Sequence, residues 1–231
     1  MNYINHIIEP NKLLITWQSS DKAHRTRFVV AELRKAHEKI TLEYLNNTSD
    51  FRQACALGFD AYPAFRETDK IHEQGIMDAL MRRLPPKTRG DYVQYLEGFR
   101  INPDTGMSDF ALLGYTGARL PSDGFAIIHP FNNANTPFEF LAEAAGYRYY
   151  RNHVQINANE PVSFIIEPDA AFGDTIKIVS NNNLIGYITR ALIPNFKTWL
   201  KNEWVKEAWI EKINGSPDHP IIYIYVRVEP S

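Results

Sequence analysis

Hydrophobic and polar residues alternate, or form short β-branched runs, through much of the second half of the chain. The densest such stretch runs from Gly146 to Arg190, and turn-forming residues separate its runs. Strands are predicted at Tyr147–Tyr150, Val162–Ile166, Thr175–Val179 and Leu184–Ile188. Because these strands are short and the segment is too small for two sheets, the pattern predicts a small β-barrel.

The first half mixes short strands with short helices. Strands are predicted at Leu13–Trp17, Arg27–Leu33, Ile40–Leu45 and Phe125–His129. Helices are predicted at Phe51–Leu57, Ile76–Arg83, Thr88–Phe99 and Phe110–Tyr115. The polar, turn-rich segment 132–137 has few apolar residues, so it is predicted to be a linker between two domains.

Beyond that segment, Phe138–Ala144 alternates like a strand, although its Ala, Glu and Leu residues also suit a helix. A helix is predicted at Ile193–Glu203, followed by strands at Ala208–Ile213 and Ile221–Val228. The fold class predicted is therefore α+β. Residues 1–131 are expected to form a mixed domain of antiparallel strands and short helices, and residues 138–231 a small β-barrel with one helix.

Composition adds few constraints. The single cysteine, Cys55, excludes a disulfide framework, and its Ala and Leu neighbours at helical spacing predict a small buried core residue. The N-terminus lacks a secretory signal pattern and no apolar run reaches the length of a membrane span, so a cytoplasmic protein is expected.

The charge balance bears on partners. The net charge is −2, and residues 137–231 hold nine Lys and Arg against eleven Asp and Glu. Bulk electrostatics therefore favour no polyanionic partner, and any contact with nucleic acid has to be local.

Catalytic motifs are missing from the sequence. It contains no phosphate-binding P-loop, no GxSxG, no HExxH and no GxGxxG, and its histidines show no ligand spacing. We expect no enzyme, no cofactor and no metal. One alternative stays open, an enzyme with a site between the two halves, at the loops Gly58–Phe65 and Gly117–Gly124, which contain Gly, Asp and Tyr.

Aromatic and basic residues cluster at positions 147–151, in the order Tyr-Arg-Tyr-Tyr-Arg. On a strand, Arg148 and Tyr150 would share one face, and Tyr147, Tyr149 and Arg151 the other. The face that is not core would offer a ring beside a guanidinium, which is how single-stranded nucleic acid is often bound.

These residues lie in a stretch, about 137–231, that resembles a HIRAN domain, the small OB-like barrel of helicase-like chromatin remodellers and some bacterial proteins. The matching pieces are Gly146–Tyr150, the block Val162–Val179, Ile185–Ile188 and the helix near Pro194–Leu200. The resemblance implies binding of single-stranded DNA, in particular its 3′ end.

In that family an Arg-Tyr-Tyr run grips backbone and base, and a Tyr-Asp pair caps the terminal nucleotide. Arg148, Tyr149 and Tyr150 match the run. Phe172 stands at the Tyr position, while Gly173 stands at the Asp position and Asp174 follows it. The nucleic-acid candidates are these side chains with Lys177: Arg148, Tyr149, Tyr150, Phe172, Asp174 and Lys177.

Residues from about 10 to 131 resemble, more faintly, the N-terminal subdomain of HipA-family kinases. The pieces are the paired strands at Leu13–Leu33, the step Arg83-Leu84-Pro85 and the segment Asp109–Pro130. That subdomain is not catalytic, and a free-standing copy acts in toxin–antitoxin systems as an antitoxin docked on a separate kinase. The resemblance implies a HipA-like Ser/Thr kinase as partner.

A basic concentration between Arg82 and Arg100 fits either a solvated helical face or a patch for an acidic partner. The candidate partner-binding residues are Arg82, Arg83, Arg89 and Arg119. The function predicted is a non-catalytic binding protein that docks a kinase and binds nucleic acid. The alternative is a protein–protein interaction module without a nucleic-acid role.

Overall fold

The chain has an α+β fold divided into two compact units. The computed structural model describes residues 3–21, 26–150, 154–169, 173–216 and 219–230. The N-terminal unit extends to Asn133 but excludes Ile4–Ile7, which belong with the C-terminal unit that begins at Ala134. The division falls within the segment 132–137 that the sequence marks as a linker.

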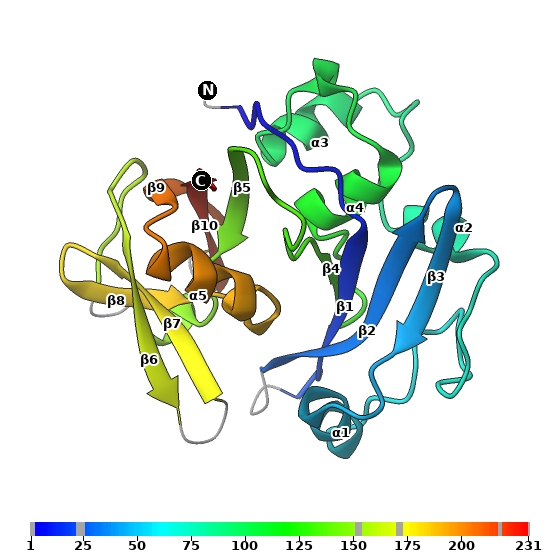
Figure 1. The fold of residues 1–231 in the computed structure, drawn as a ribbon. Coiled ribbons are helices and arrows are strands. Elements are labelled where there is room, and N and C mark those ends of the chain that lie inside the picture. The colour runs from blue at the N-terminus through cyan, green and yellow to red at the C-terminus, as the bar shows by residue number, and fades with distance from the viewer. Residues whose placement is uncertain (1–2, 22–25, 151–153, 170–172, 217–218, 231) are drawn as a thin grey trace. The chain divides into compact units, whose positions relative to one another are not determined.

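The N-terminal unit is built on a four-stranded antiparallel sheet (Figure 1). Its strand order is β3-β2-β1-β4, from β1 (Lys12–Gln18), β2 (Arg27–Ala36), β3 (Lys39–Tyr44) and β4 (Phe125–Ile128). Its helices are α1 (Ser49–Ala56), α2 (Ile76–Met81), α3 (Tyr92–Gly98), the 3₁₀ turn η1 (Pro103–Thr105) and α4 (Asp109–Thr116). The strand and helix predictions for this half are confirmed, with shifted ends.

Local sequence explains where α4 begins and ends. The Ser108 hydroxyl accepts a hydrogen bond from the Ala111 backbone N–H at 3.1 Å, so it caps the first turn. Gly117, at φ 75°, ends the helix in the left-handed conformation that glycine adopts without strain. Between them the helix is almost entirely buried, which suits its apolar sequence.

A buried arginine ties the end of α2 to the loop before β4. The Arg83 side chain is 3% exposed, and its two terminal nitrogens each donate to an Asp123 carboxylate oxygen at 2.8 Å. The guanidinium also donates to the backbone carbonyls of Ala118 (2.7 Å) and Phe125 (3.2 Å). A buried cation with this many partners is a structural element, because any lost partner leaves charge unpaired.

Cys55 corrects a prediction, because it is exposed rather than part of the core. The face of α1 that is buried carries Phe51 and Ala54. Position 55 is one residue, or about 100°, beyond Ala54 on the helix, so it points away from that face.

The C-terminal unit contains two open three-stranded antiparallel sheets (Figure 1). The first has the order β5-β10-β9, from β5 (Phe138–Glu143), β9 (Val205–Ser216) and β10 (His219–Val228). The second has the order β6-β7-β8, from β6 (Ser163–Asp169), β7 (Gly173–Ser180) and β8 (Asn183–Tyr187). Its helical parts are η2 (Tyr147–Tyr149), η3 (Arg190–Leu192) and α5 (Ile193–Lys201).

The two sheets form no continuous closed barrel among the described residues. Two isolated antiparallel bridges nevertheless join their edges, one between Ala145 and Tyr187 and one between Pro161 and Trp209. Register shifts within the β7–β8 and β9–β10 pairs interrupt these two ladders locally.

An aromatic core lies beneath α5. Phe196 and Trp199 of this helix are buried, and the Phe196 ring centroid is 4.7 Å from that of Phe164 in β6. Trp199 packs edge-on against Phe138 of β5 at 5.4 Å. The helix thus contacts residues of both sheets, and the helix predicted at Ile193–Glu203 is confirmed with shifted ends.

The segment Ile4–Ile7 is held to the C-terminal unit by a buried carboxylate. Glu139 in β5 accepts hydrogen bonds from the backbone N–H groups of Asn5 (3.2 Å) and His6 (2.8 Å). The same carboxylate lies 2.8 Å from His6 Nδ1. Glu139 is thereby satisfied although it is almost fully buried.

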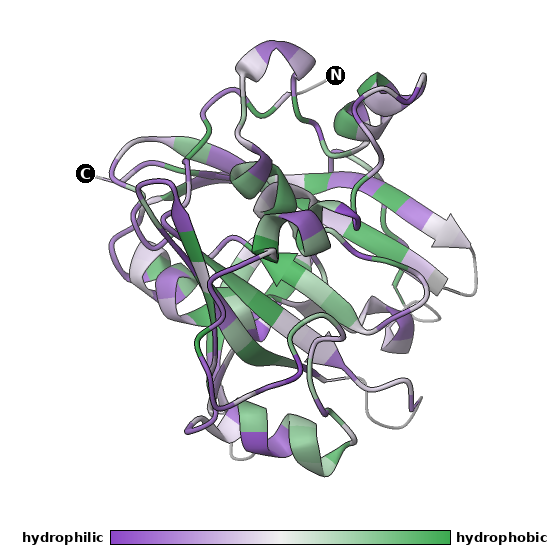
Figure 2. Cartoon of the chain, turned by 90° about the vertical axis from the view of Figure 1, so that its right-hand side faces the viewer, coloured by the Kyte–Doolittle hydropathy of each residue, from purple (hydrophilic) through white to green (hydrophobic). Residues whose placement is uncertain are grey.

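Hydrophobic stretches follow the strands, while many loops are hydrophilic (Figure 2). Across the described ranges, no helix is both long and apolar enough to cross a membrane.

Removing the Asp123 charge tests the ion pair between buried Arg83 and Asp123, whose side chain is 28% exposed. In Asp123→Asn we expect the free energy of unfolding to fall by about 3 kcal/mol, because the Arg83 charge loses its partner. Chemical denaturation measures the change. Asp91→Asn is the matched control, because its partner Arg89 is on the surface and such pairs contribute little. Equal stability of Asp123→Asn and parent would contradict the structural role.

The pH dependence of stability gives a second readout for the same variant. Burial alone would raise the pKa of Asp123, but the hydrogen bonds and charge of Arg83 outweigh it and hold the pKa below its ordinary value. The ionised carboxylate therefore stabilises the fold above about pH 4, and this contribution is lost as the pH falls below that. In Asp123→Asn, the free energy of unfolding should lack this decrease below about pH 4, because the variant has no carboxylate to protonate.

Candidate nucleic-acid interface

The aromatic–basic run at 147–150 is a 3₁₀ turn, so its prediction as a strand is wrong. Gly146, at φ 84°, takes a left-handed conformation after β5. The N–H groups of Tyr149 and Tyr150 then donate to the carbonyls of Gly146 (3.0 Å) and Tyr147 (2.8 Å). The left-handed glycine decides the outcome, because tyrosine and arginine alone tolerate either conformation.

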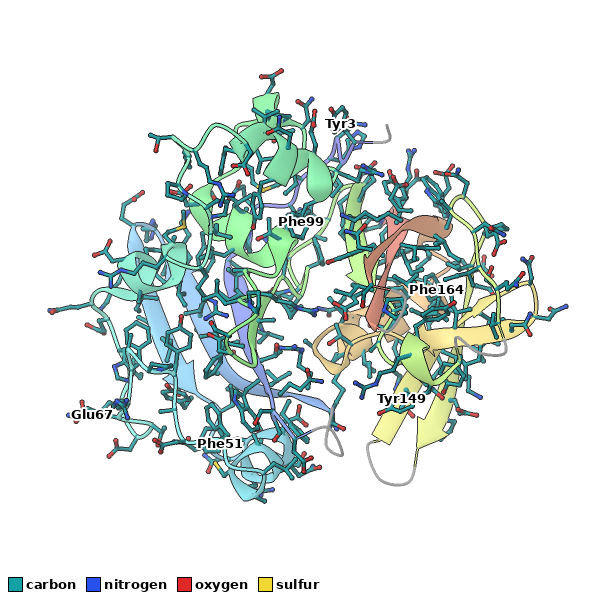
Figure 3. All side chains as sticks on the ribbon, turned by 180° about the vertical axis from the view of Figure 1, so that it is seen from behind. Tyr3, Phe51, Glu67, Phe99, Tyr149 and Phe164 are labelled. Atoms are coloured by element: carbon teal, nitrogen blue, oxygen red, sulfur yellow. The ribbon has the colours of Figure 1, made fainter. Side chains whose placement is uncertain are left out.

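The turn distributes the side chains differently from a strand. Tyr147 is buried and its hydroxyl donates to the Val154 carbonyl at 3.1 Å. Tyr149 lies on the outside of the unit, 63% exposed (Figure 3). The Arg148 guanidinium carbon is 4.7 Å from the Tyr149 ring centroid, and one of its nitrogens donates to the Tyr149 hydroxyl at 2.6 Å. Arg148 therefore pairs with Tyr149, and the predicted pairing with Tyr150 is wrong.

Tyr150 turns the other way and meets β8. Its hydroxyl donates to the Tyr187 hydroxyl at 3.5 Å. Burial and this hydrogen bond together raise the pKa of Tyr150 to about 12. The phenol stays protonated at neutral pH and offers a polar tip on a half-buried ring.

A row of side chains crosses the neighbouring sheet beside these tyrosines. Lys177, in the central strand β7, is directly opposite Ile165 of β6 and Tyr187 of β8. Glu167, also in β6, accepts a hydrogen bond from Lys177 at 2.8 Å. We call Ile165, Glu167, Lys177 and Tyr187 the Lys177 face. Its lysine and glutamate are close enough to Tyr150 to shift the phenol pKa in opposite directions, although less than burial does.

Asp174 is separated from the Lys177 face. Along β7 it alternates with Lys177, so it shares a side with the buried Ile176 and Ile178. Its carboxylate pairs with Lys197 of α5. Gly173 begins β7 at φ 78°, which suits glycine. Phe172, the remaining candidate, lies outside the described residues.

The arginines predicted as partner-binding residues differ in exposure. Arg83 is buried in its pair with Asp123, so its prediction as a contact residue is wrong. Arg82, Arg89 and Arg119 are exposed, and Arg89 pairs with Asp91 at 2.6 Å. Arg82 and Arg83 are neighbours in the sequence, but the first is exposed and the second is buried.

Arg83 also contacts the loops Gly58–Phe65 and Gly117–Gly124, where the alternative of an enzyme would place its site. It lies 3.4 Å from the Tyr62 hydroxyl in one loop and binds Asp123 in the other. Both loops are part of the N-terminal unit. Where the chain is described, no group of three or more His, Cys, Asp or Glu is placed to hold a metal ion.

Tyr187 and Glu167 are the functional candidates that sequence reasoning missed. The signal was present in part, because the predicted strands Thr175–Val179 and Leu184–Ile188 flank an Asn-rich turn at 181–183. Strand alternation could then have placed Tyr187 near Lys177. The irregular register between Ile178 and Val179 makes the pairing unreadable from spacing alone.

Comparison of the chain with protein-family models, with curated proteins and with solved structures finds no match.

The hydroxyl pair gives a test of the site geometry. In Tyr187→Phe the pKa of Tyr150 should fall, because its neutral form loses a hydrogen-bond acceptor while burial persists. Titration of ¹³Cζ-labelled tyrosines by NMR measures the shift. Tyr44 is the internal control, since burial raises its pKa to about 12 in the other unit. An unchanged pKa of Tyr150 in Tyr187→Phe would show that the two hydroxyls do not interact.

Proposed function

We propose that this is a non-catalytic binding protein whose C-terminal unit binds single-stranded nucleic acid. The observation that carries the proposal is the exposed Tyr149 ring with the Arg148 guanidinium beside it. A ring of this kind can stack on any base, and a guanidinium can contact the adjoining phosphate. Binding would tolerate many sequences, because every base has a π-face.

The Lys177 face extends this surface. Tyr150 and Tyr187 are half-exposed rings beside Lys177, and their hydroxyls already meet. Ile165, 50% exposed, adds an apolar contact for a sugar or base. We propose that a strand of nucleic acid runs from Tyr149 across this face.

A HIRAN-like barrel is part of the proposal. The two bridges, Ala145 to Tyr187 and Pro161 to Trp209, connect the sheets in the circular order β5-β10-β9-β6-β7-β8. This order supports an irregular barrel held at two seams by single bridges. Small barrels of this class bind oligonucleotides on a sheet face.

Recognition of a 3′ end is less well supported than binding along the strand. The carboxylate that would cap a terminal nucleotide is absent at Gly173, and Asp174 is engaged by Lys197 on the opposite side of β7. The acidic balance of residues 137–231 also predicts modest affinity, because few cations are available to neutralise phosphates. We therefore propose binding to internal single-stranded segments.

Arg148→Ala/Tyr149→Ala tests the proposal. We expect this variant to bind a labelled single-stranded oligothymidylate more weakly by about 1–3 kcal/mol, from the lost stacking. The slope of log K against log salt should fall by about one unit, from the lost phosphate contact. Fluorescence anisotropy at several salt concentrations measures both.

The control for that variant is Lys212→Ala/Tyr223→Ala, which removes a similar cation and ring, 4.4 Å apart, from the other sheet. It should bind like the parent. Equal affinity of the Arg148/Tyr149 variant and the parent would refute the site. If the parent binds no single strand even at low salt, the alternative of a protein–protein interaction module is favoured, with exposed Ile165 as an apolar contact.

For the N-terminal unit we propose docking to a HipA-like Ser/Thr kinase, as in toxin–antitoxin systems. Arg83 and Asp123 support the family resemblance, because they join two of its matching pieces, 83–85 and 109–130, in one ion pair. With Arg83 committed to the interior, the exposed Arg82, Arg89 and Arg119 remain as the contact candidates.

Charge reversal tests the docking. Arg82→Glu/Arg119→Glu should weaken a complex with a purified HipA-family kinase by about tenfold or more, because like charges then face an acidic partner. Size-exclusion chromatography and biolayer interferometry measure the complex. Lys39→Glu, an exposed reversal on β3, is the control and should bind normally. No complex with the parent protein would refute the docking.

A further inference from the structure

The cation of the Lys177 face is already neutralised within the protein. Lys177 Nζ is 2.8 Å from Glu167 Oε1, and the two side chains are 27% and 46% exposed. Glu167 is opposite Thr175 in the register, two residues from Lys177 on the same side of the sheet. The pair is therefore a diagonal cross-strand ion pair that solvent can reach.

No other cation on this sheet can take the place of Lys177. It is the only Lys or Arg in β6, β7 and β8. Lys177 is therefore the one cation that these three strands offer to a phosphate crossing this face. The Glu167 carboxylate already accepts a hydrogen bond from the Lys177 ammonium, so a phosphate would compete with Glu167 for this ammonium.

We infer that Glu167 is an intramolecular competitor for phosphate that sets the affinity of the Lys177 face for single-stranded nucleic acid. This inference rests on the proposed function of the same site. An incoming phosphate exchanges with the Glu167 carboxylate at the Lys177 ammonium. The exchange is feasible because solvent-accessible ion pairs are weak.

The exchange has a consequence for salt dependence. A phosphate neutralised by a free lysine releases a condensed cation, which steepens the dependence of affinity on salt. In the parent protein the displaced Glu167 carboxylate becomes free and attracts a cation in return. The cation attracted by Glu167 offsets the cation released from the nucleic acid. Lys177 therefore contributes little to the salt slope while Glu167 is present.

Glu167→Gln separates this role from a structural one. We expect this variant to bind labelled single-stranded oligothymidylate about two- to fivefold more tightly at low salt, since the ammonium no longer has to leave a carboxylate. The salt slope should steepen by about one unit. Anisotropy titrations over a salt series measure both, and thermal unfolding checks that the fold is retained.

Two further variants make the test specific. Glu207→Gln, at an exposed position of β9, changes the net charge equally but is on the other sheet, so it should leave affinity nearly unchanged. Glu167→Gln/Lys177→Ala should lose the gain, because Glu167 acts through Lys177.

The outcomes distinguish the inference from the proposed function. If the parent binds the oligonucleotide and Glu167→Gln binds no more tightly, the competitor role is wrong and the binding site stands. An equal gain in Glu207→Gln, or a gain that survives in Glu167→Gln/Lys177→Ala, also overturns the competitor role. If neither parent nor Glu167→Gln binds at low salt, both are refuted.

Discussion

The close approach of two backbone segments at Gly186 determines where the candidate site forms. A Cβ at this position would lie 2.8 Å from the Ala145 carbonyl oxygen, and its φ of 151° also favours glycine. Ala145 and Tyr187 exchange backbone hydrogen bonds of 2.9 Å in both directions. Since Gly146 and η2 follow directly, this contact places Tyr150 beside Tyr187. A side chain at Gly186 would separate the segments and with them the two rings.

The two units use their basic groups in a similar way but at different depths. Arg83 is nearly inaccessible, and its bonds to Asp123 and three other oxygens make it part of the core. Lys177 is also committed to an internal carboxylate, but solvent reaches both partners. The same type of ion pair is therefore structural in one unit and exchangeable in the other, because desolvation decides the cost of breaking it.

The sequence predicts the elements of this fold better than it predicts the site. Strong alternation locates β7 and β10, and an apolar stripe locates α5, because these patterns follow directly from burial on one side. The turn at 147–149 is missed because one left-handed glycine overrides the strand tendency of tyrosine. The burial of Arg83 and the pairing of Lys177 with Glu167 depend on tertiary contacts 40 and 10 residues away, which local patterns do not encode.

Photo-crosslinking tests the central claim most directly, namely that Tyr149 and the Lys177 face together bind a single strand. A bromodeoxyuridine-substituted oligonucleotide is irradiated with the intact protein, and the adducts are mapped by mass spectrometry. We predict adducts at the rings of Tyr149, Tyr150 and Tyr187, because bases stacked on these rings are in contact with them. Adducts confined to rings outside this surface, such as Tyr92 or Tyr223, or no adducts under conditions where the strand binds, would contradict it.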